Sequence, residues 1–330
     1  MCKVSPENVT HRHPEISLHS VPLFVSVTIY VMLEITHPTP DELETTLQVA
    51  FRHLPPNESP LRIGTIMQHY QAGKIDLSGI FQAKRDNKLV GALYAQSQPD
   101  GSIMLWIPSM TEEFSLEPLM EPLAQFCRSK HAFAAVALAD RQQTVDERTL
   151  CSVGQFQFLS DLIYLAAEIA PQETSEKPYR LNFVPLSGDS DDEMERLTLL
   201  VKATYNNSLD FPDLMQIAPV EQVVHGYKAG AVFRPELWFF IRHEGVDIGM
   251  LLLTDAAADQ FELTYMGLLE SARGCGFSKE IVRFARERTS RESRPLLLTS
   301  VDEKNIPACQ TYLSLGFKAW DRKRVYVRFF

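Results

Sequence analysis

The stretch Arg273-Gly274-Cys275-Gly276-Phe277-Ser278 lies between an apolar segment and an amphipathic one. The apolar segment, residues 261–268, predicts a strand, and residues 276–289 predict a helix. Successive backbone N–H groups at a helix N-terminus bind anions, and glycines let the backbone approach a ligand closely. The stretch therefore predicts a strand–loop–helix unit that binds a pyrophosphate. A glycine-rich turn without a ligand is the alternative that this stretch alone leaves open.

Two further points about this loop follow from its residues. Arg273 contributes either a phosphate contact or a packing contact. Gly274 and Gly276 also match the start of the dinucleotide-binding GxGxxG motif, but Lys279 stands where a third glycine would allow close packing of helix on strand. The strand before the loop is also the fourth of its domain rather than the first. A dinucleotide-binding fold is therefore disfavoured.

A second group of residues follows the loop by about thirty positions. Asn305, Ala308 and Tyr312 recur at helical spacing, so they share one face of a helix predicted over 305–315, which ends before Gly316-Phe317. A tyrosine at that place is suited to protonate a departing thiolate as general acid. The alternative is a half-buried aromatic side chain that packs against the sheet.

With both groups in place, residues 179–330 resemble a GNAT-type N-acyltransferase domain. The family's loop pattern, Arg/Gln-x-x-Gly-x-Gly/Ala, is matched by Arg273 and Gly276, with the small Ser278 at the last position. Its later pattern, Asn-x-x-Ala-x-x-x-Tyr-x-x-x-Gly-Phe, is matched in full. The resemblance implies an α/β fold with a central twisted mixed sheet flanked by helices. It also implies acyl-CoA, usually acetyl-CoA, as cosubstrate and transfer to an amine by direct attack in a ternary complex.

The resemblance assigns roles to individual residues. In this family the central strand separates from its neighbour, and its backbone binds the pantetheine arm and polarises the thioester carbonyl. Glu262 matches the position of the general-base glutamate in the histone-acetylating members, and Tyr312 that of the general acid. A carboxylate on a solvated strand face is the alternative for Glu262. The coenzyme-binding residues that the resemblance implies are Met266, Gly267, Leu268, Arg273, Gly274, Cys275, Gly276, Phe277, Ser278 and Asn305.

The first half of the chain repeats this order of predicted elements without the motifs. Its loop after the strand at 103–108 contains no glycine and adds Glu112 and Glu113, which would repel a pyrophosphate. We therefore expect a tandem of GNAT-like domains: a degenerate one at 32–170, a proline-bracketed linker at 171–178, and the coenzyme-binding one at 179–330. Residues 1–31 are expected to be an extension, either a strand or sequence translated from an early start codon.

Composition limits the remaining possibilities. A net charge of −10 and a pI near 5.4 argue against a nucleic-acid binder. The apolar run at 21–31 is too short to span a bilayer, so no membrane partner is expected. Histidine and cysteine spacing matches no metal site, and scattered cysteines fit the cytoplasm.

Other candidates are weaker. Cys275 and Cys309 have no partner pattern of a catalytic nucleophile, and Lys279, Arg283 and Arg286 are expected on a solvated helix face. The sequence names no acceptor beyond a small-molecule or peptide amine and no oligomeric state. A non-catalytic acyl-CoA sensor or scaffold is the alternative function.

Overall fold

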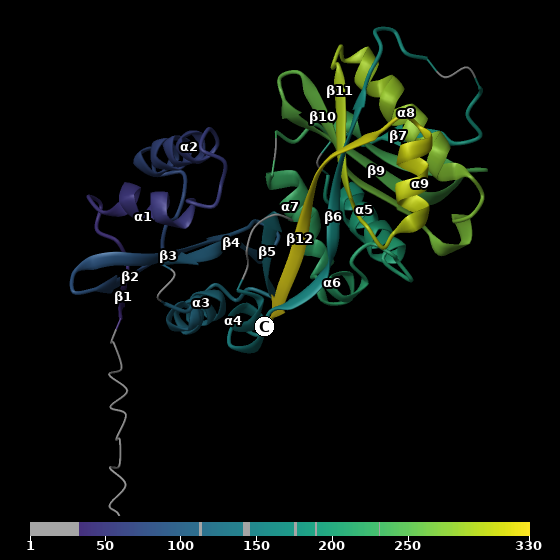
Figure 1. Ribbon diagram of the computed structural model, residues 1–330. Coiled ribbons are helices and arrows are strands. Elements are labelled where there is room, and N and C mark those ends of the chain that lie inside the picture. The colour runs from purple at the N-terminus through teal and green to yellow at the C-terminus, as the bar shows by residue number, and fades with distance from the viewer. Residues whose placement is uncertain (1–32, 112–113, 141–145, 175–176, 189, 231) are drawn as a thin grey trace, which may run out of the picture. The chain divides into compact units, whose positions relative to one another are not determined.

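One mixed sheet of twelve strands runs through the described part of the chain, which in this computed structural model comprises residues 33–330 except 112–113, 141–145, 175–176, 189 and 231. The strand order is β1-β2-β3-β4-β5-β12-β6-β11-β10-β9-β8-β7 (Figure 1). The predicted α/β class with a mixed sheet flanked by helices is confirmed. Contacts separate residues 1–32 from residues 33–330, and the predictions for 1–31 lie outside the described residues.

The two edges of the sheet repeat one plan. From each edge inward, antiparallel strands lead to a parallel pair, β4 with β5 in one half and β10 with β11 in the other. The strands are β1 Glu34–Thr36, β2 Ile80–Arg85, β3 Lys88–Ser97, β4 Ser102–Met110, β5 Ala134–Asp140, β6 Gln157–Glu168, β7 Asn182–Pro185, β8 Trp238–His243, β9 Val246–Ala257, β10 Gln260–Leu268, β11 Leu296–Asp302 and β12 Lys318–Phe329.

Helices cover both faces of the sheet. In the first half α1 and α2 pack on the face that carries Tyr94 and Trp106, and α3 packs on the face that carries Leu105 (Figure 1). The helices are α1 Leu43–Ala50, α2 Ser59–Gln71, α3 Glu117–Ser129, α4 Glu147–Ser152, α5 Asp191–Thr204, α6 Pro212–Ile217, α7 Val220–Ala229, α8 Phe277–Arg291 and α9 Ile306–Ser314, with 3₁₀ turns η1 Pro235–Leu237 and η2 Glu270–Ala272.

The last strand of each half completes the other half's part of the sheet. β6, from the first half of the sequence, pairs antiparallel with β11 from Leu162 to Glu168. β12, the final strand of the chain, pairs antiparallel with β5. β6 and β12 also pair with each other, so the sheet is unbroken across the predicted linker. The division of the chain at 171–178 stays a prediction.

The linker region is held to the second half by ion pairs. Arg286 on α8 donates to both carboxylate oxygens of Glu173, at 2.6 and 3.0 Å, and to the carbonyls of Leu315 and Glu168. Glu280, which is only 2% exposed, accepts from the N–H of Leu181 and from Arg180. The Arg286 side chain was expected on a solvated face; instead it joins the linker, β6 and the end of α9.

Three sequence predictions need correction. The two closing strands expected near 318–320 and 325–329 are one strand, β12, because Trp320 is the extra residue of a β-bulge and does not end the pairing. The tight turn and strands expected over 150–169 contain the short helix α4 before a single strand, β6. Helix α6 was not predicted, because Pro212 reads as a break in the sequence yet occupies the first turn of a helix.

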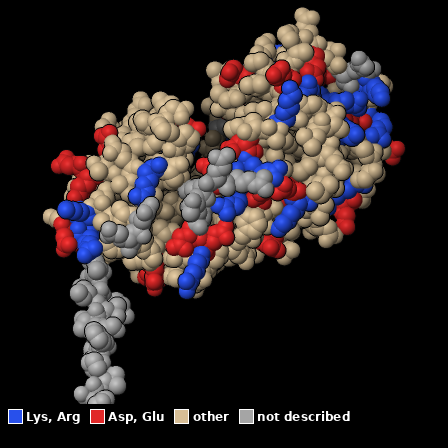
Figure 2. All heavy atoms as spheres, in the orientation of Figure 1, with Lys and Arg blue, Asp and Glu red and all other residues tan. Residues whose placement is uncertain are grey.

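None of the helices in the described residues is long and apolar enough to cross a membrane. The predicted cytoplasmic location stays a prediction. Figure 2 shows acidic and basic side chains interspersed over the visible face.

Candidate active site

The main candidate site is a cavity of about 650 Å³ where β10 and β11 separate. These parallel strands pair only from Gln260 to Glu262, opposite Leu296 to Leu298. Beyond that point the cavity lies between residues 263–268 of β10 and residues 299–301 of β11. The Thr299 hydroxyl donates to the Leu263 carbonyl at 3.0 Å. A side-chain hydrogen bond therefore joins the two strands directly after their last backbone pair.

A β-bulge and a glycine shape the β10 wall of this cavity. The register against β9 shifts between Leu263 and Tyr265, which leaves Thr264 as the extra residue and bends the strand. A Cβ on Gly267 would lie 2.7 Å from the Thr204 hydroxyl and 2.5 Å from the Tyr265 hydroxyl. Glycine is therefore required there because the end of α5 approaches the strand closely. Met266, Gly267 and Leu268 line the cavity, so the predicted pantetheine-binding segment lies in its wall.

The predicted phosphate loop lies at the N-terminus of α8 and opens into the same cavity. Gly274 and Gly276 have φ of 75° and 77°, a left-handed conformation that glycine adopts without strain. The fifteen-residue helix begins at Phe277 with no side-chain cap. Its first N–H groups and its positive dipole end are therefore available to an anion. Gly274, Gly276, Phe277 and Ser278 line the cavity, whereas the side chain of Cys275 is exposed and outside the lining.

Arg273 has a packing role in this structure. Its Nε donates to the Leu268 carbonyl at 3.1 Å, and its two Nη atoms donate to the carbonyls of Asn207 and Thr204, both at 2.8 Å. The guanidinium group thus ties the end of α5 to the end of β10 beside the loop. Of the two contributions expected from Arg273, the structure contains the packing contact.

The residues of the second motif form and position α9. The Asn305 side chain caps the helix by accepting from the N–H of Ala308 at 3.3 Å. Gly316 follows the helix with φ 85°, and the ring of Phe317 packs 5.3 Å from that of Tyr312. Asn305, Ala308 and Tyr312 all line the cavity, so the predicted shared face points into it.

Comparison with known proteins agrees with this geometry. A GCN5-related N-acetyltransferase from Sphaerobacter thermophilus matches 90% of this chain and 95% of its own, with TM-score 0.59 and 14% sequence identity. A GCN5-related glucosamine N-acetyltransferase region of a fungal multi-domain GH3 β-N-acetylglucosaminidase matches 90% of this chain and 38% of its own, with TM-score 0.60 and 14% identity. No family model and no curated protein matches the sequence.

The chain has the fold of the GCN5-related N-acetyltransferases. The first of these matches extends over nearly the full length of both chains, and strand order repeats from the two edges of the sheet. The chain is therefore a tandem arrangement of two GNAT-like folds, as the sequence predicted.

Tyr312, the predicted general acid, is a buried phenol in the wall of this cavity. Its side chain is 4% exposed and lines the cavity between α9 and β11. Burial raises the pKa of Tyr312 well above its ordinary value, and the Thr299 hydroxyl opposes this in part. The phenol is therefore protonated at neutral pH, which is the state a general acid requires.

Glu262 lies outside the lining of the cavity. Its register partner on β9 is Thr254, and that of Tyr265 is Leu252, so the bulge places Glu262 and Tyr265 on the same face of the sheet. Glu262 is half-buried, and burial alone raises its pKa. It is the last residue of the β10–β11 pairing, one step before the strands separate. Its predicted role as base stays a prediction.

The cavity contains functional groups that the sequence analysis did not assign. Asp210, Tyr205 and Tyr265 line it, and the rings of Tyr205 and Tyr265 lie 6.2 Å apart. Tyr227 on α7 stacks on Tyr265 at 5.6 Å. These residues come from the segment after α5, from β10 and from α7, so their sequence pattern does not show that they meet. The sequence places the acceptor beside residues 205–211, and Asp210 of that segment lines the cavity.

The remaining candidates have structural roles. The Cys309 thiol donates to the Asp302 carbonyl at 3.6 Å, and burial raises its pKa, so a reactive thiolate is disfavoured. Cys275 donates to the Arg273 carbonyl at 3.7 Å. The Arg283 guanidinium lies 6.0 Å from the ring of Tyr179. The described residues contain no group of three His, Cys, Asp or Glu side chains that could hold a metal.

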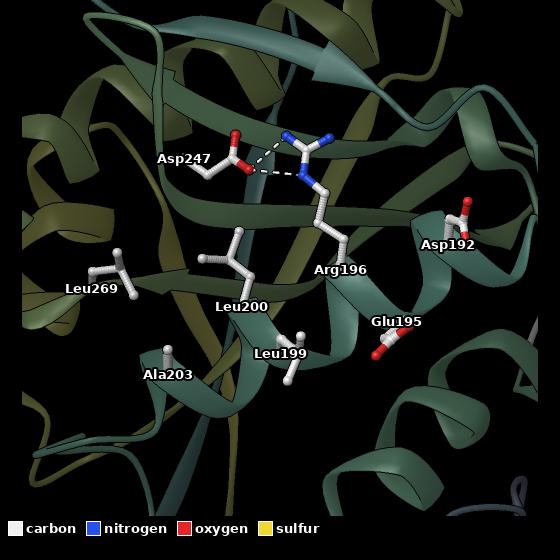
Figure 3. A pocket seen from close by; sticks show the side chains of 8 residues that line it. All are labelled: Asp192, Glu195, Arg196, Leu199, Leu200, Ala203, Asp247 and Leu269. Carbon is white, nitrogen blue, oxygen red and sulfur yellow. Dashed lines mark hydrogen bonds and ion pairs between the residues drawn. The ribbon is translucent and has the colours of Figure 1, made fainter.

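A second hollow, of about 570 Å³, lies on the outer side of α5 and is shown in Figure 3. Its main charged group, Arg196, donates to Asp247 at 2.5 and 2.8 Å and stacks 3.9 Å above the ring of Phe240. The rest of the lining includes Leu199, which is 61% exposed. Its one basic side chain is thus paired with Asp247, and its other two acidic side chains, Asp192 and Glu195, are exposed on the surface.

Proposed function

We propose that the chain is an acetyltransferase that moves the acetyl group of acetyl-CoA to an amine. The observation that carries this proposal is the convergence of three features on one cavity: the separated β10 and β11, the glycine loop at α8, and Tyr312. A thioester bound there would have its phosphates at the loop and its sulfur toward α9. The remote match to acetyltransferase folds supports the same reaction class.

In the proposed reaction the neutral amine attacks the thioester carbon and forms a C–N bond. Backbone N–H groups near Met266 and Gly267 would stabilise the oxyanion, because preorganised donors act strongly where water is partly excluded. The C–S bond then breaks, and Tyr312 gives its proton to the thiolate. A carboxylate on the acceptor side takes the proton that the nitrogen loses, and the sequence predicts Glu262 for this step.

Isothermal titration with acetyl-CoA, followed by thiol release with a panel of amines, tests this function. We expect binding well below millimolar Kd and release of free thiol that depends on the amine. Absence of binding at millimolar acetyl-CoA would contradict the proposal. Binding without thiol release for any amine would instead favour the acyl-CoA sensor or scaffold, the alternative function that the sequence leaves open.

Glu262→Gln tests the predicted base. If Glu262 takes the amine proton, the variant lowers kcat at neutral pH and leaves acetyl-CoA affinity nearly unchanged. An unchanged rate would remove Glu262 from the mechanism.

A further inference from the structure

Asp210 is the carboxylate that the cavity itself contains. It lies in the segment between α5 and α6, and the pocket that holds Tyr312 is lined by Asp210 as well. Among the residues that line this cavity, all within the described chain, the acidic side chains are Asp210 and Glu270, and Arg273 is the sole basic one. Glu270 accepts from the amide of Asn207 at 2.9 Å, and the Arg273 guanidinium is bound to carbonyls.

One oxygen of Asp210 is fixed and the other is available. The N–H of Asp302 on β11 donates to Oδ1 of Asp210 at 2.9 Å. In return Asp302, which is 1% exposed, accepts from the N–H groups of Phe211 and Lys304. Oδ2 of Asp210 accepts no hydrogen bond from a described residue, and it is not fully buried. The reciprocal link between the segment and β11 therefore holds the carboxylate in place with one oxygen open to the cavity.

The groups that face Asp210 are phenols, a thiol and one carboxylate. They are Tyr205 directly after α5, Tyr227 on α7, Tyr265 on β10, Cys309 and Tyr312 on α9, and Asp302 on β11. Each of the phenols and the thiol interacts electrostatically with Asp210, and no cation is among these groups. Burial, and next the charge of Asp302, raise the pKa of Asp210 to about 6, against the hydrogen bond from Asp302. A negative group without a positive partner favours a cationic ligand.

We propose that Asp210, rather than Glu262, binds the acceptor amine and accepts its proton, and that the acceptor is a small cationic amine without a carboxylate beside the amino group. This rests on the proposed acetyl transfer. The bound ammonium ion first loses one proton to Oδ2 of Asp210, which passes it to water, and the neutral amine then attacks the acetyl carbon. As the C–N bond forms and the C–S bond breaks, the nitrogen gives a second proton to Asp210, which also leaves to water. Tyr312 gives its proton to the leaving thiolate and regains one from water, so the net products are an amide and free CoA thiol.

The neighbouring surface supports an apolar body for this acceptor. Tyr205, Leu209 and Met215 line the cavity and also an adjoining hollow of about 800 Å³ over α6 and the start of α7. Leu209 is 53% exposed, and its side chain lies beside the polar Asn207 and Ser208 in the lining of both. An amine nitrogen at Asp210 would place its carbon substituent against these side chains.

The test uses the full chain with acetyl-CoA and two matched acceptors, benzylamine and its carboxylated counterpart phenylglycine. Asp210→Asn keeps an oxygen for the N–H of Asp302 and removes only the charge. We expect it to lower kcat/KM for benzylamine by about 100-fold, with acetyl-CoA affinity close to that of the wild type and a melting temperature that is not lower. Glu262→Gln should change the same rate by only about threefold. Wild-type enzyme should prefer benzylamine to phenylglycine.

The pH profile distinguishes proton transfer from a structural role. Wild-type kcat/KM should decrease as the pH falls below about 6. This decrease should be absent in Asp210→Asn and restored in part in Asp210→Glu. A loss in Glu262→Gln larger than that in Asp210→Asn, or an unchanged acid limb in Asp210→Asn, would overturn the proposal. If no amine is acetylated, the proposed transfer fails, and benzylamine titrated with the CoA-bound protein still decides the issue. Binding to wild type but not to Asp210→Asn supports the carboxylate as the cation site, and equal or absent binding overturns it.

Discussion

The two halves of this protein differ most at the parallel pair in the middle of each half. In the first half β4 and β5 stay paired from Ser102 to Trp106, whereas in the second half β10 and β11 separate after Glu262. Both central strands carry a bulge, but the bulge of β4 lies after Trp106 and includes Pro108, and that of β10 lies at Thr264. In both halves the parallel pairing ends just before the bulge, so the earlier bulge of β10 goes with an earlier separation of its strands.

Large aromatic side chains pack beside the central strand of the first half. Tyr94 and Trp106 stack with ring centroids 4.5 Å apart and an interplanar angle of 9°, and Phe51 meets both edge-on. Tyr94 is fully buried in this cluster. In the second half the strand carries Gly267, against which Thr204 packs, and the volume beyond it is the cavity. The central strand of the first half is thus packed by an aromatic cluster, whereas that of the second half borders a cavity.

The largest expected effect comes from separating the halves. Residues 171–330 alone contain every residue that lines the cavity, but they lack β6, which pairs with both β11 and β12. Without it β11 becomes an unpaired edge beside the site. We expect this fragment to aggregate and to bind no acetyl-CoA, and co-expression with residues 33–170 to restore a soluble complex that binds. Gel filtration and titration measure both. A well-folded, binding fragment would show that the exchanged strands are dispensable.

Removal of the Tyr312 hydroxyl should have the next largest effect. Tyr312→Phe keeps the ring that packs on Phe317 and removes the proton donor, so kcat should fall by about 100-fold, or about 2.7 kcal/mol in the barrier. Acetyl-CoA affinity should change little. The control is Tyr94→Phe in the first half, which also removes a buried hydroxyl but lies in the filled core. Equal rates for the two variants, measured by thiol release, would exclude Tyr312 as the acid.

Much of the fold was predictable from sequence because local patterns determine it. Alternation of apolar residues gave β8 to β11, and glycines at positive φ marked the turns at Gly245 and Gly316. The exchange of β6 and β12 was not predictable, since it depends on which of two similar edges a strand joins. A strand's own residues do not specify its partner when both edges are apolar.

The part of the site that local motifs form was predictable from sequence. Gly276, Asn305 and Tyr312 have roles in a turn, a cap and a helix face, and each is readable from neighbouring residues. The sequence predicted the acceptor beside residues 205–211 but not which of them lines the cavity, because the position of Asp210 depends on a hydrogen bond to Asp302, which is 92 residues away. Long-range contacts of this kind leave no trace in a single sequence.

Two carboxylates, one in each half, should change the stability of the fold in opposite directions as the pH rises. The pKa of Asp210 is raised to about 6, so its ionisation destabilises the fold as pH rises from about 4 to 6. Hydrogen bonds from Ser78 and Lys130 lower the pKa of Asp76 to about 2, so its contribution is present above about pH 4 and is lost as pH falls toward 2.

Asp210→Asn should therefore stabilise the unliganded protein at pH 7, by about 1 to 2 kcal/mol after allowance for solvent around a half-buried group, and have little effect at pH 4. Asp76→Asn should destabilise it slightly at pH 7. Urea unfolding at the two pH values measures both. A destabilising Asp210→Asn at pH 7 would show that the carboxylate has a stabilising partner.

The smallest expected effect concerns the charge of the loop. It tests whether a negative charge there weakens acetyl-CoA binding. The first half has Glu112 and Glu113 after its central strand, and Cys275 is the exposed residue of the corresponding loop in the second half. Cys275→Glu introduces one negative charge near the helix N-terminus, where a carboxylate stabilises the helix but competes with a bound phosphate. We expect acetyl-CoA affinity to fall by about tenfold, or about 1.4 kcal/mol, with an unchanged or higher melting temperature.

Cys275→Gln is the matched control, since it has nearly the same size without the charge. It should bind acetyl-CoA about as well as the wild type. The difference between the two variants should shrink in high salt, because an exposed charge is screened there. Titration of both variants at low and high salt measures the effect. Equal losses in the Glu and Gln variants would show that the charge of a residue at this position does not control coenzyme binding.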